Sequence, residues 1–169
     1  REFRDNAKPF ALSACFHELH SPIATDPRLS ELYAGHENSK YMGNITQLDD
    51  ALGQVMRALE EEGVSGDTLL IFTSDNGPVP AFGGTTGGLR GAKRSDHEGG
   101  IRVPGVVRWP GRIKPGTTSD VPVVGTDIFA TVLEITGIAL LNDRTIDSVS
   151  MVPAFAGKPV ERKIPLFWR

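Results

Sequence analysis

Two oxygen-bearing side chains, Asp75 and Asn76, directly follow the apolar run 68–73 and Ser74. A carboxylate beside an amide carbonyl supplies two hard oxygen ligands, which suit Ca²⁺ or Mg²⁺. In open α/β sheets, ligands bind outside the carboxyl ends of the strands, so a position after a strand fits such a site. The segment Ser74 to Gly77 also has the composition of an ordinary turn, and both interpretations stay open at this point.

A lysine and a histidine are the other candidates for chemistry. Lys93 lies in a glycine-rich loop, where the backbone can approach a ligand closely and a cation can neutralise an oxyanion. His20 follows the apolar run 10–16, and a loop histidine there can bind an anion or carry a proton. His17 lies three residues away, but Pro22 argues against the helix that would align the two imidazoles on a metal. A solvated surface lysine and incidental loop histidines are the alternatives.

Two amphipathic helices are predicted around these candidates. Apolar residues spaced by three and four along 40–62 form one stripe, which predicts a helix that stops at Gly63. Residues 127–136 predict a second helix, with Asp127 as its N-cap and Gly137 as its stop.

Short apolar runs predict three strands, over residues 10–16, 68–73 and 103–109. The second run is nearly continuous, which is typical of a strand buried on both faces of a parallel sheet. Because a helix precedes this strand after a short turn, we expect an α/β fold with a mainly parallel central sheet flanked by helices. Residues 26–38 and 138–169 are predicted to be irregular.

Composition narrows the class of protein. The 169 residues are 39% apolar and 23% charged, which is typical of a globular domain rather than a disordered chain. A net charge of −3 gives no general basic surface for nucleic acid, and no apolar run approaches a membrane span. The single cysteine, Cys15, excludes an internal disulfide. Asn44-Ile45-Thr46 fits a glycosylation sequon, but it lies within the predicted helix and is interpreted as chance.

The order of the motifs resembles the sulfatase family, the formylglycine-dependent sulfuric ester hydrolases of the alkaline-phosphatase-like superfamily. The resemblance covers about residues 8–168, and its segments are Lys8–Phe10, His20–Pro22, Tyr41–Asp49, Gly53–Gly63, Asp67–Gly77, Arg90–Lys93, Glu98–Pro104, Trp109–Gly111 and Asp127–Gly137. It implies an alkaline-phosphatase-like α/β sandwich, of which this chain is an incomplete part.

The resemblance also implies roles at the matching positions. Asp75 and Asn76 correspond to half of a Ca²⁺ site, and Lys93 corresponds to a lysine that contacts the sulfate and the nucleophile. His20 corresponds to a histidine near the sulfate or the leaving-group oxygen. The implied substrate is a small-molecule or carbohydrate sulfate ester. The implied location is an exported one, whether periplasmic, secreted or lysosomal.

Departures from the family pattern concern the nucleophile. Formylglycine forms in a Cys/Ser-x-Pro-x-Arg motif, and the residues after Cys15 contain neither that proline nor that arginine. The family also takes acidic calcium ligands from a strand near its N-terminus, and no matching Asp-Asp pair occurs here. Leu19 stands where the family usually has proline before the histidine. We therefore expect residues 1–169 to be a partial catalytic domain, without the N-terminal nucleophile segment or the C-terminal subdomain.

Such a chain is expected to be inactive alone and to need the remainder of the sulfatase polypeptide as its partner. Two alternatives remain open. One is a phosphodiesterase or phosphonate hydrolase of the same superfamily, and the other is a truncated binding module without catalysis.

Overall fold

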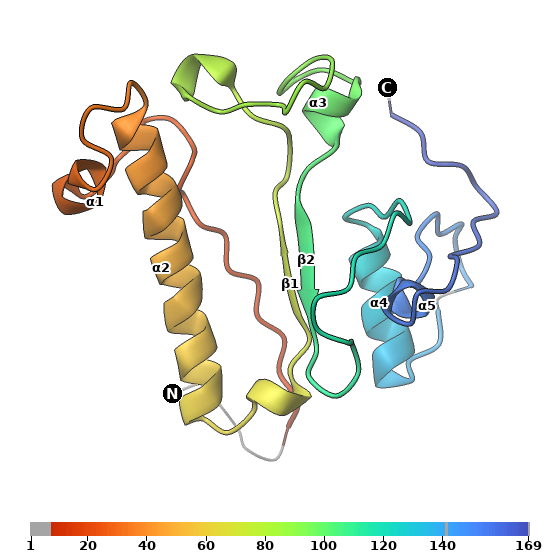
Figure 1. Ribbon diagram of the computed structural model, residues 1–169. Coiled ribbons are helices and arrows are strands. Elements are labelled where there is room, and N and C mark those ends of the chain that lie inside the picture. The colour runs from red at the N-terminus through yellow and green to blue at the C-terminus, as the bar shows by residue number, and fades with distance from the viewer. Residues whose placement is uncertain (1–7, 141, 169) are drawn as a thin grey trace. The chain divides into compact units, whose positions relative to one another are not determined.

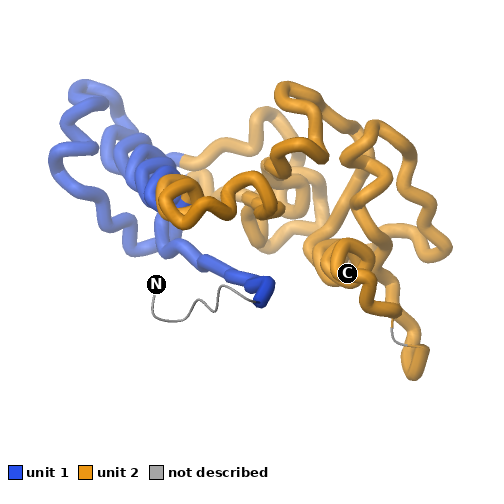
Figure 2. Tube along the Cα trace, turned by 90° about the horizontal axis from the view of Figure 1, so that it is seen from below, with its two compact units in different colours: residues 1–55, 81–83 blue, residues 56–80, 84–169 orange. Residues whose placement is uncertain are grey.

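The computed structural model describes residues 8–140 and 142–168. The chain divides into two compact units, coloured separately in Figure 2: residues 1–55 with 81–83 form the first unit, and residues 56–80 with 84–169 the second. In chain order the elements are α1 (Pro27–Glu31), α2 (Ser39–Glu61), η1 (Ser65–Asp67), β1 (Leu70–Thr73), η2 (Pro80–Phe82), α3 (Glu98–Ile101), β2 (Gly105–Arg108), α4 (Asp127–Thr136) and α5 (Val152–Phe155), as Figure 1 shows. Over the described residues, no helix has the length and apolar character needed to cross a membrane.

Helix α2 confirms the first predicted helix. Beyond its last residue, Gly63 adopts a positive φ of 67°, and its N–H donates to the carbonyl of Glu60 at 2.9 Å. Glycine adopts this left-handed conformation without steric cost, so it ends the helix as predicted. The apolar stripe is only partly covered, because the side chain of Ile45 is 41% exposed.

Helix α1 was not predicted, because residues 26–38 were interpreted as irregular. Asp26 is its N-cap, and the Asp26 carboxylate accepts a hydrogen bond from the N–H of Arg28 at 2.9 Å. Pro27 occupies the first turn, where its missing N–H costs nothing. The Asp-Pro pair was therefore a helix-start signal that the sequence analysis left unused.

Strands β1 and β2 pair antiparallel, from Leu70 opposite Arg108 to Thr73 opposite Gly105. Both strands were predicted, but the expected parallel arrangement is not found in this pair. The connection leaves and re-enters at the same end of the sheet, where α3 lies in Figure 1, and such a return makes neighbouring strands antiparallel. The guanidinium of Arg108 also donates to the Ser65 carbonyl at 3.3 Å, which holds the far end of β2 against η1.

Burial is lower than the sequence predicted. The strand predicted to be buried on both faces, β1, contains three half-buried residues and an exposed Thr73, and Val106 in the neighbouring β2 is 56% exposed. The predicted strand 10–16 is wrong, because this segment has no strand assignment and Leu12 is 72% exposed. A β-strand exists only when a neighbour completes its hydrogen bonds, and the described sheet contains only β1 and β2.

Helix α4 confirms the second predicted helix, and Gly137 ends it with a φ of 70°. Asp127 is not the N-cap; that position belongs to Thr126. The carboxylate of Asp127 instead lies fully buried and pairs with the guanidinium of Arg162, an arrangement that no local sequence signal indicates. This pair joins α4 to the C-terminal residues of the second unit. Residues 138–169 were predicted to be irregular, but they contain the short helix α5.

Candidate functional site

The turn after β1 presents the two candidate metal ligands. Asp75 is exposed and Asn76 is half-buried. The Ser74 hydroxyl donates to the Asn76 carbonyl at 3.0 Å, which shapes the turn. The Thr73 hydroxyl donates to the Pro104 carbonyl at 3.1 Å, which ties the end of β1 to the start of β2.

Backbone hydrogen bonds place Lys93 beside this turn. The N–H of Lys93 donates to the Pro78 carbonyl at 3.0 Å, only two residues after Asn76. The N–H of Gly77 donates to the Gly100 carbonyl at 2.8 Å and joins the same turn to α3. The structure thus brings Asp75, Asn76 and Lys93 into adjoining segments of the second unit.

Glycines allow these segments to approach. A Cβ built on Gly77 would lie 2.0 Å from the Gly99 carbonyl oxygen, and one on Gly99 would lie 2.2 Å from the Gly91 carbonyl oxygen. Real Cβ atoms cannot come so close, so any side chain there would force the turn, the Lys93 loop and α3 apart. Close backbone contact therefore explains the glycines at 77, 99 and 100, whereas a Cβ on Gly87 or Gly88 would meet open space.

The candidate side chains are available to a ligand. Within the described part of the chain, no salt bridge holds Asp75 or Lys93. A lysine without a carboxylate partner keeps its positive charge for an anion, and an exposed carboxylate keeps its lone pairs for a cation.

His20 belongs to the first unit and is exposed. Its Nδ1 lies 2.8 Å from the Ser21 carbonyl oxygen, which can only accept, so Nδ1 carries the proton and donates. Nε2 is then the ring atom that can bind an anion or transfer a proton. The His17 and His20 rings meet edge to face with centroids 5.9 Å apart. A role for His20 alongside Lys93 stays a prediction.

The oxygen donors of Asp75 and Asn76 are of the type that Ca²⁺ binds, but two donors are fewer than Ca²⁺ needs. Carboxylate and amide oxygens are calcium ligands, yet Ca²⁺ takes about 6–8 oxygens. Among the described residues, no group of three or more histidine, cysteine, aspartate or glutamate side chains could hold a metal ion. Asp75 and Asn76 offer suitable donor atoms but too few of them, so a Ca²⁺ site at these residues stays a prediction.

The sequence analysis missed one pair of residues in the first unit. Asn44 is 2% exposed, and its side-chain amide bonds to Leu19 and Ala24 on either side of His20. The side-chain amide of Gln47 binds the same loop, because it donates to the Glu18 carboxylate and accepts from the N–H of Asp26. The only signal at Asn44 was the sequon, and its buried helical position leaves no accessible acceptor for a glycan in this fold.

A sequence model of the sulfatase family matches residues 1–138 of the chain. The chain belongs to the sulfatase family. Among its relatives, the chain is 35% identical over 163 residues to the steryl-sulfatase of Mus musculus, covering 91% of the chain and 26% of that protein. It is 32% identical over 166 residues to the N-acetylgalactosamine-6-sulfatase of Canis lupus familiaris, covering 95% of the chain and 31% of that protein. The chain thus spans about a quarter to a third of the length of these relatives.

A solved structure supports the same assignment. The PsFucS1 sulfatase from Pseudoalteromonas sp. superposes with a TM-score of 0.74 at 28% identity, covering 84% of this chain and 29% of that one. The predicted alkaline-phosphatase-like fold is therefore confirmed, and the described elements are a small mixed helix and strand part of it.

Proposed function

We propose that this chain forms part of a sulfatase active site that hydrolyses a sulfate ester. Lys93 and His20 bind the sulfate, and Asp75 and Asn76 contribute to a Ca²⁺ site. The formylglycine nucleophile comes from residues outside the 169. The observation that supports this proposal is the backbone hydrogen bond from Lys93 to Pro78, which joins the lysine loop to the turn that carries Asp75 and Asn76 in a member of this family.

Lys93 stabilises the negative charge of the reacting group. A sulfuryl group has several oxygens that share negative charge during cleavage, and a fixed ammonium stabilises that charge where it develops. The lysine loop is anchored through the Lys93 N–H, and no salt bridge among the described residues holds the ammonium away from an anion. Bound calcium would supply further positive charge to the same oxygens.

His20 serves the departing oxygen. Because Nδ1 donates to the Ser21 carbonyl, the proton that an alkoxide leaving group needs is held at Nε2 of the protonated ring. The exposed position of His20 leaves Nε2 open to a substrate.

The substrate class follows from the relatives. Their names indicate a sterol sulfate and a sugar sulfate, so we propose a small-molecule or carbohydrate sulfate monoester for this protein. Because specificity is usually determined by loops, we propose that residues of the loop 78–97 contribute to the choice of substrate. The remaining polypeptide of the sulfatase is the partner, and export from the cytoplasm is expected as in the family.

Activity is tested with 4-nitrophenyl sulfate on two samples: the complete gene product that contains these residues, and the 169-residue chain alone. We expect turnover by the complete gene product and none by the chain alone, because the chain has no nucleophile motif. Turnover by the isolated chain would place the nucleophile within it. A complete gene product with a formylglycine motif and bound calcium, but no turnover of any sulfate ester, would refute the sulfatase activity.

A further inference from the structure

We propose that Asn44 and Gln47 are positioning residues that fix both ends of the loop carrying His20. This loop, residues 18–26, is called the His20 loop below. The inference rests on the proposed function only for the role of His20 in the reaction. The anchoring itself is carried by contacts within the first unit.

Asn44 binds the His20 loop on both sides of the histidine. Its Oδ1 accepts from the N–H of Leu19 at 2.6 Å, and its Nδ2 donates to the carbonyl of Ala24 at 3.1 Å. The two partners fix the orientation of the amide, because a flipped group would set N–H against N–H and oxygen against oxygen. The Asn44 side chain is 2% exposed, so its own amide depends on these two bonds for its hydrogen-bond partners.

Gln47 repeats the same arrangement one turn later on α2. Its Nε2 donates to the Glu18 carboxylate at 3.1 Å, and its Oε1 accepts from the N–H of Asp26 at 3.0 Å. Residues three apart lie on one face of a helix, so both amides project toward the same loop. The loop is therefore held just before His20 and again after it, by two rigidly spaced groups.

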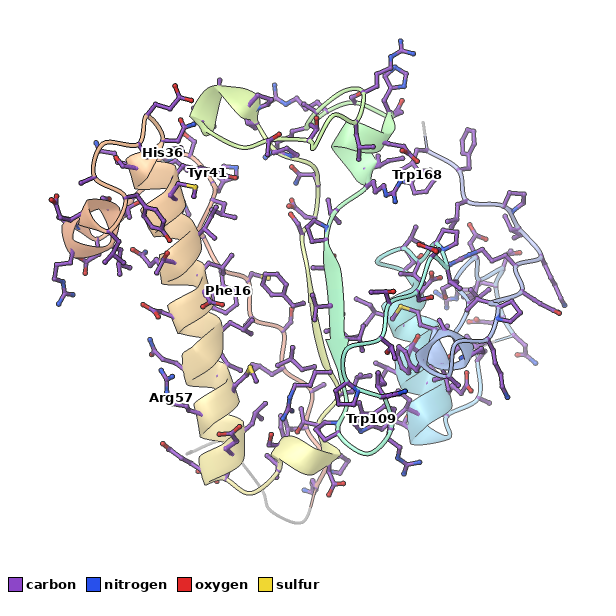
Figure 3. All side chains as sticks on the ribbon, viewed as in Figure 1. Phe16, His36, Tyr41, Arg57, Trp109 and Trp168 are labelled. Atoms are coloured by element: carbon purple, nitrogen blue, oxygen red, sulfur yellow. The ribbon has the colours of Figure 1, made fainter. Side chains whose placement is uncertain are left out.

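The base of this arrangement is itself rigid. A Cβ built on Gly43 would lie 2.7 Å from the backbone nitrogen of Ser30, so α2 contacts the backbone of the α1 region directly. The hydroxyls of Tyr33 and Thr46 are 2.7 Å apart and hydrogen-bond across the same interface. In Figure 3 the label Tyr41 lies in the first turn of α2, and Asn44 follows three residues later along the same helix. An anchor on such a base can set the position of a neighbouring loop.

Leu19 shows why the loop needs an anchor. Its φ is 70°, in the left-handed region that residues with a Cβ rarely adopt. Such a conformation persists only where the surroundings impose it. The N–H of Leu19 donates to Asn44, and the next residue is His20, so the bond that holds the unusual backbone also sets the direction of the imidazole.

The test uses the complete gene product and three variants: Asn44→Ala, Asn44→Asp and, as control, Gln54→Ala on an exposed position of α2. Hydrogen–deuterium exchange is followed in peptides covering residues 17–26. Asn44→Ala is expected to accelerate exchange there by about tenfold, the equivalent of one net hydrogen bond, without changing peptides of α4. Unchanged exchange in residues 17–26 would refute the anchoring, whatever the enzyme hydrolyses.

Kinetics on 4-nitrophenyl sulfate test the link to His20. Asn44→Ala is expected to lower kcat by about a hundredfold with a smaller change in KM, while Gln54→Ala behaves like the parent. Faster exchange with an unchanged kcat would refute the positioning role. If the parent protein hydrolyses no sulfate ester, the proposed function fails, and the exchange result still decides whether Asn44 anchors the loop.

Asn44→Asp separates positioning from general stability. A protonated aspartic acid can accept from Leu19 and donate to Ala24, as the amide does, whereas an ionised one cannot donate. Activity relative to the parent is therefore expected to fall as the pH rises through the pKa of the introduced carboxyl. A pH profile parallel to that of the parent, at folded protein levels confirmed by circular dichroism, would contradict the assigned role.

Discussion

Replacing Lys93 with alanine lowers kcat/KM for sulfate ester hydrolysis by about a hundredfold to a thousandfold, the typical loss when a fixed group that stabilises developing negative charge is removed. The substitution removes the ammonium but keeps the backbone N–H that donates to Pro78, so the loop retains its position. Steady-state kinetics of the complete gene product with 4-nitrophenyl sulfate give this ratio directly.

Two further variants make this prediction specific. Lys114→Ala removes an exposed lysine elsewhere in the second unit and is expected to leave kcat/KM unchanged. Lys93→Arg keeps the charge on a longer, planar group and is expected to recover only part of the loss. Equal effects of Lys93→Ala and Lys114→Ala would show that Lys93 is an ordinary surface lysine, the alternative that its sequence context left open.

Replacing Asp127 with alanine destabilises the fold by about 3–5 kcal/mol, the usual cost of removing one partner of a buried ion pair. The Asp127 side chain is fully buried, and the side chain of Arg162 is 11% exposed. The carboxylate accepts from Arg162, from the N–H of Val124 at 2.9 Å and from the N–H of Val149 at 3.0 Å. Its loss leaves the N–H groups of Val124 and Val149 without an acceptor, and leaves the Arg162 guanidinium with the Pro122 carbonyl at 3.2 Å but no carboxylate.

Urea unfolding of the complete gene product measures this change. Arg144→Ala is the matched control, because Arg144 pairs with Asp143 on the exposed surface and such pairs contribute about 0–1 kcal/mol. A loss of the same small size for Asp127→Ala would contradict the buried character of the pair. Replacing both members, as Asp127→Leu with Arg162→Met, is expected to recover part of the stability, because no unpaired charge remains.

The same pair gives stability a defined pH dependence. Burial raises the pKa of the Asp127 carboxyl, but hydrogen bonds from Arg162, Val149 and Val124 outweigh burial and hold the pKa below its ordinary value of 3.8. The contribution of this group is therefore fully present above the ordinary value and is lost as the pH falls through the lowered pKa. Asp127→Asn is expected to flatten the unfolding free energy over that acidic range.

Much of the secondary structure could be predicted because it depends on local signals. Helices α2 and α4 follow from apolar spacing, and Gly63 and Gly137 mark their ends through positive φ angles. Pairing could not be predicted in the same way. The apolar run that became β1 fits a parallel or an antiparallel neighbour equally well, and only the path of the long connection to β2 decides between them.

The candidate site likewise contains residues that could be predicted from the sequence and residues that could not. Asp75, Asn76 and Lys93 could be singled out because their residue types and their order along the chain resemble a family. The residues that anchor the His20 loop could not be singled out, since Asn44 and Gln47 are polar residues on a long helix and resemble a solvated face. Their partners lie 20 to 29 residues away, at Ala24, Asp26, Leu19 and Glu18, and only the fold brings them together.

The most direct test is the position of a sulfate ester analogue in a crystal structure of the complete gene product. We expect Nζ of Lys93 within hydrogen-bond distance, about 3 Å, of an oxygen of the sulfuryl group. We also expect Asp75 and Asn76 to bind one cation beside that group. A sulfuryl group bound at a place that Lys93 does not reach, with Asp75 and Asn76 facing only solvent, would contradict the assignment of this active site.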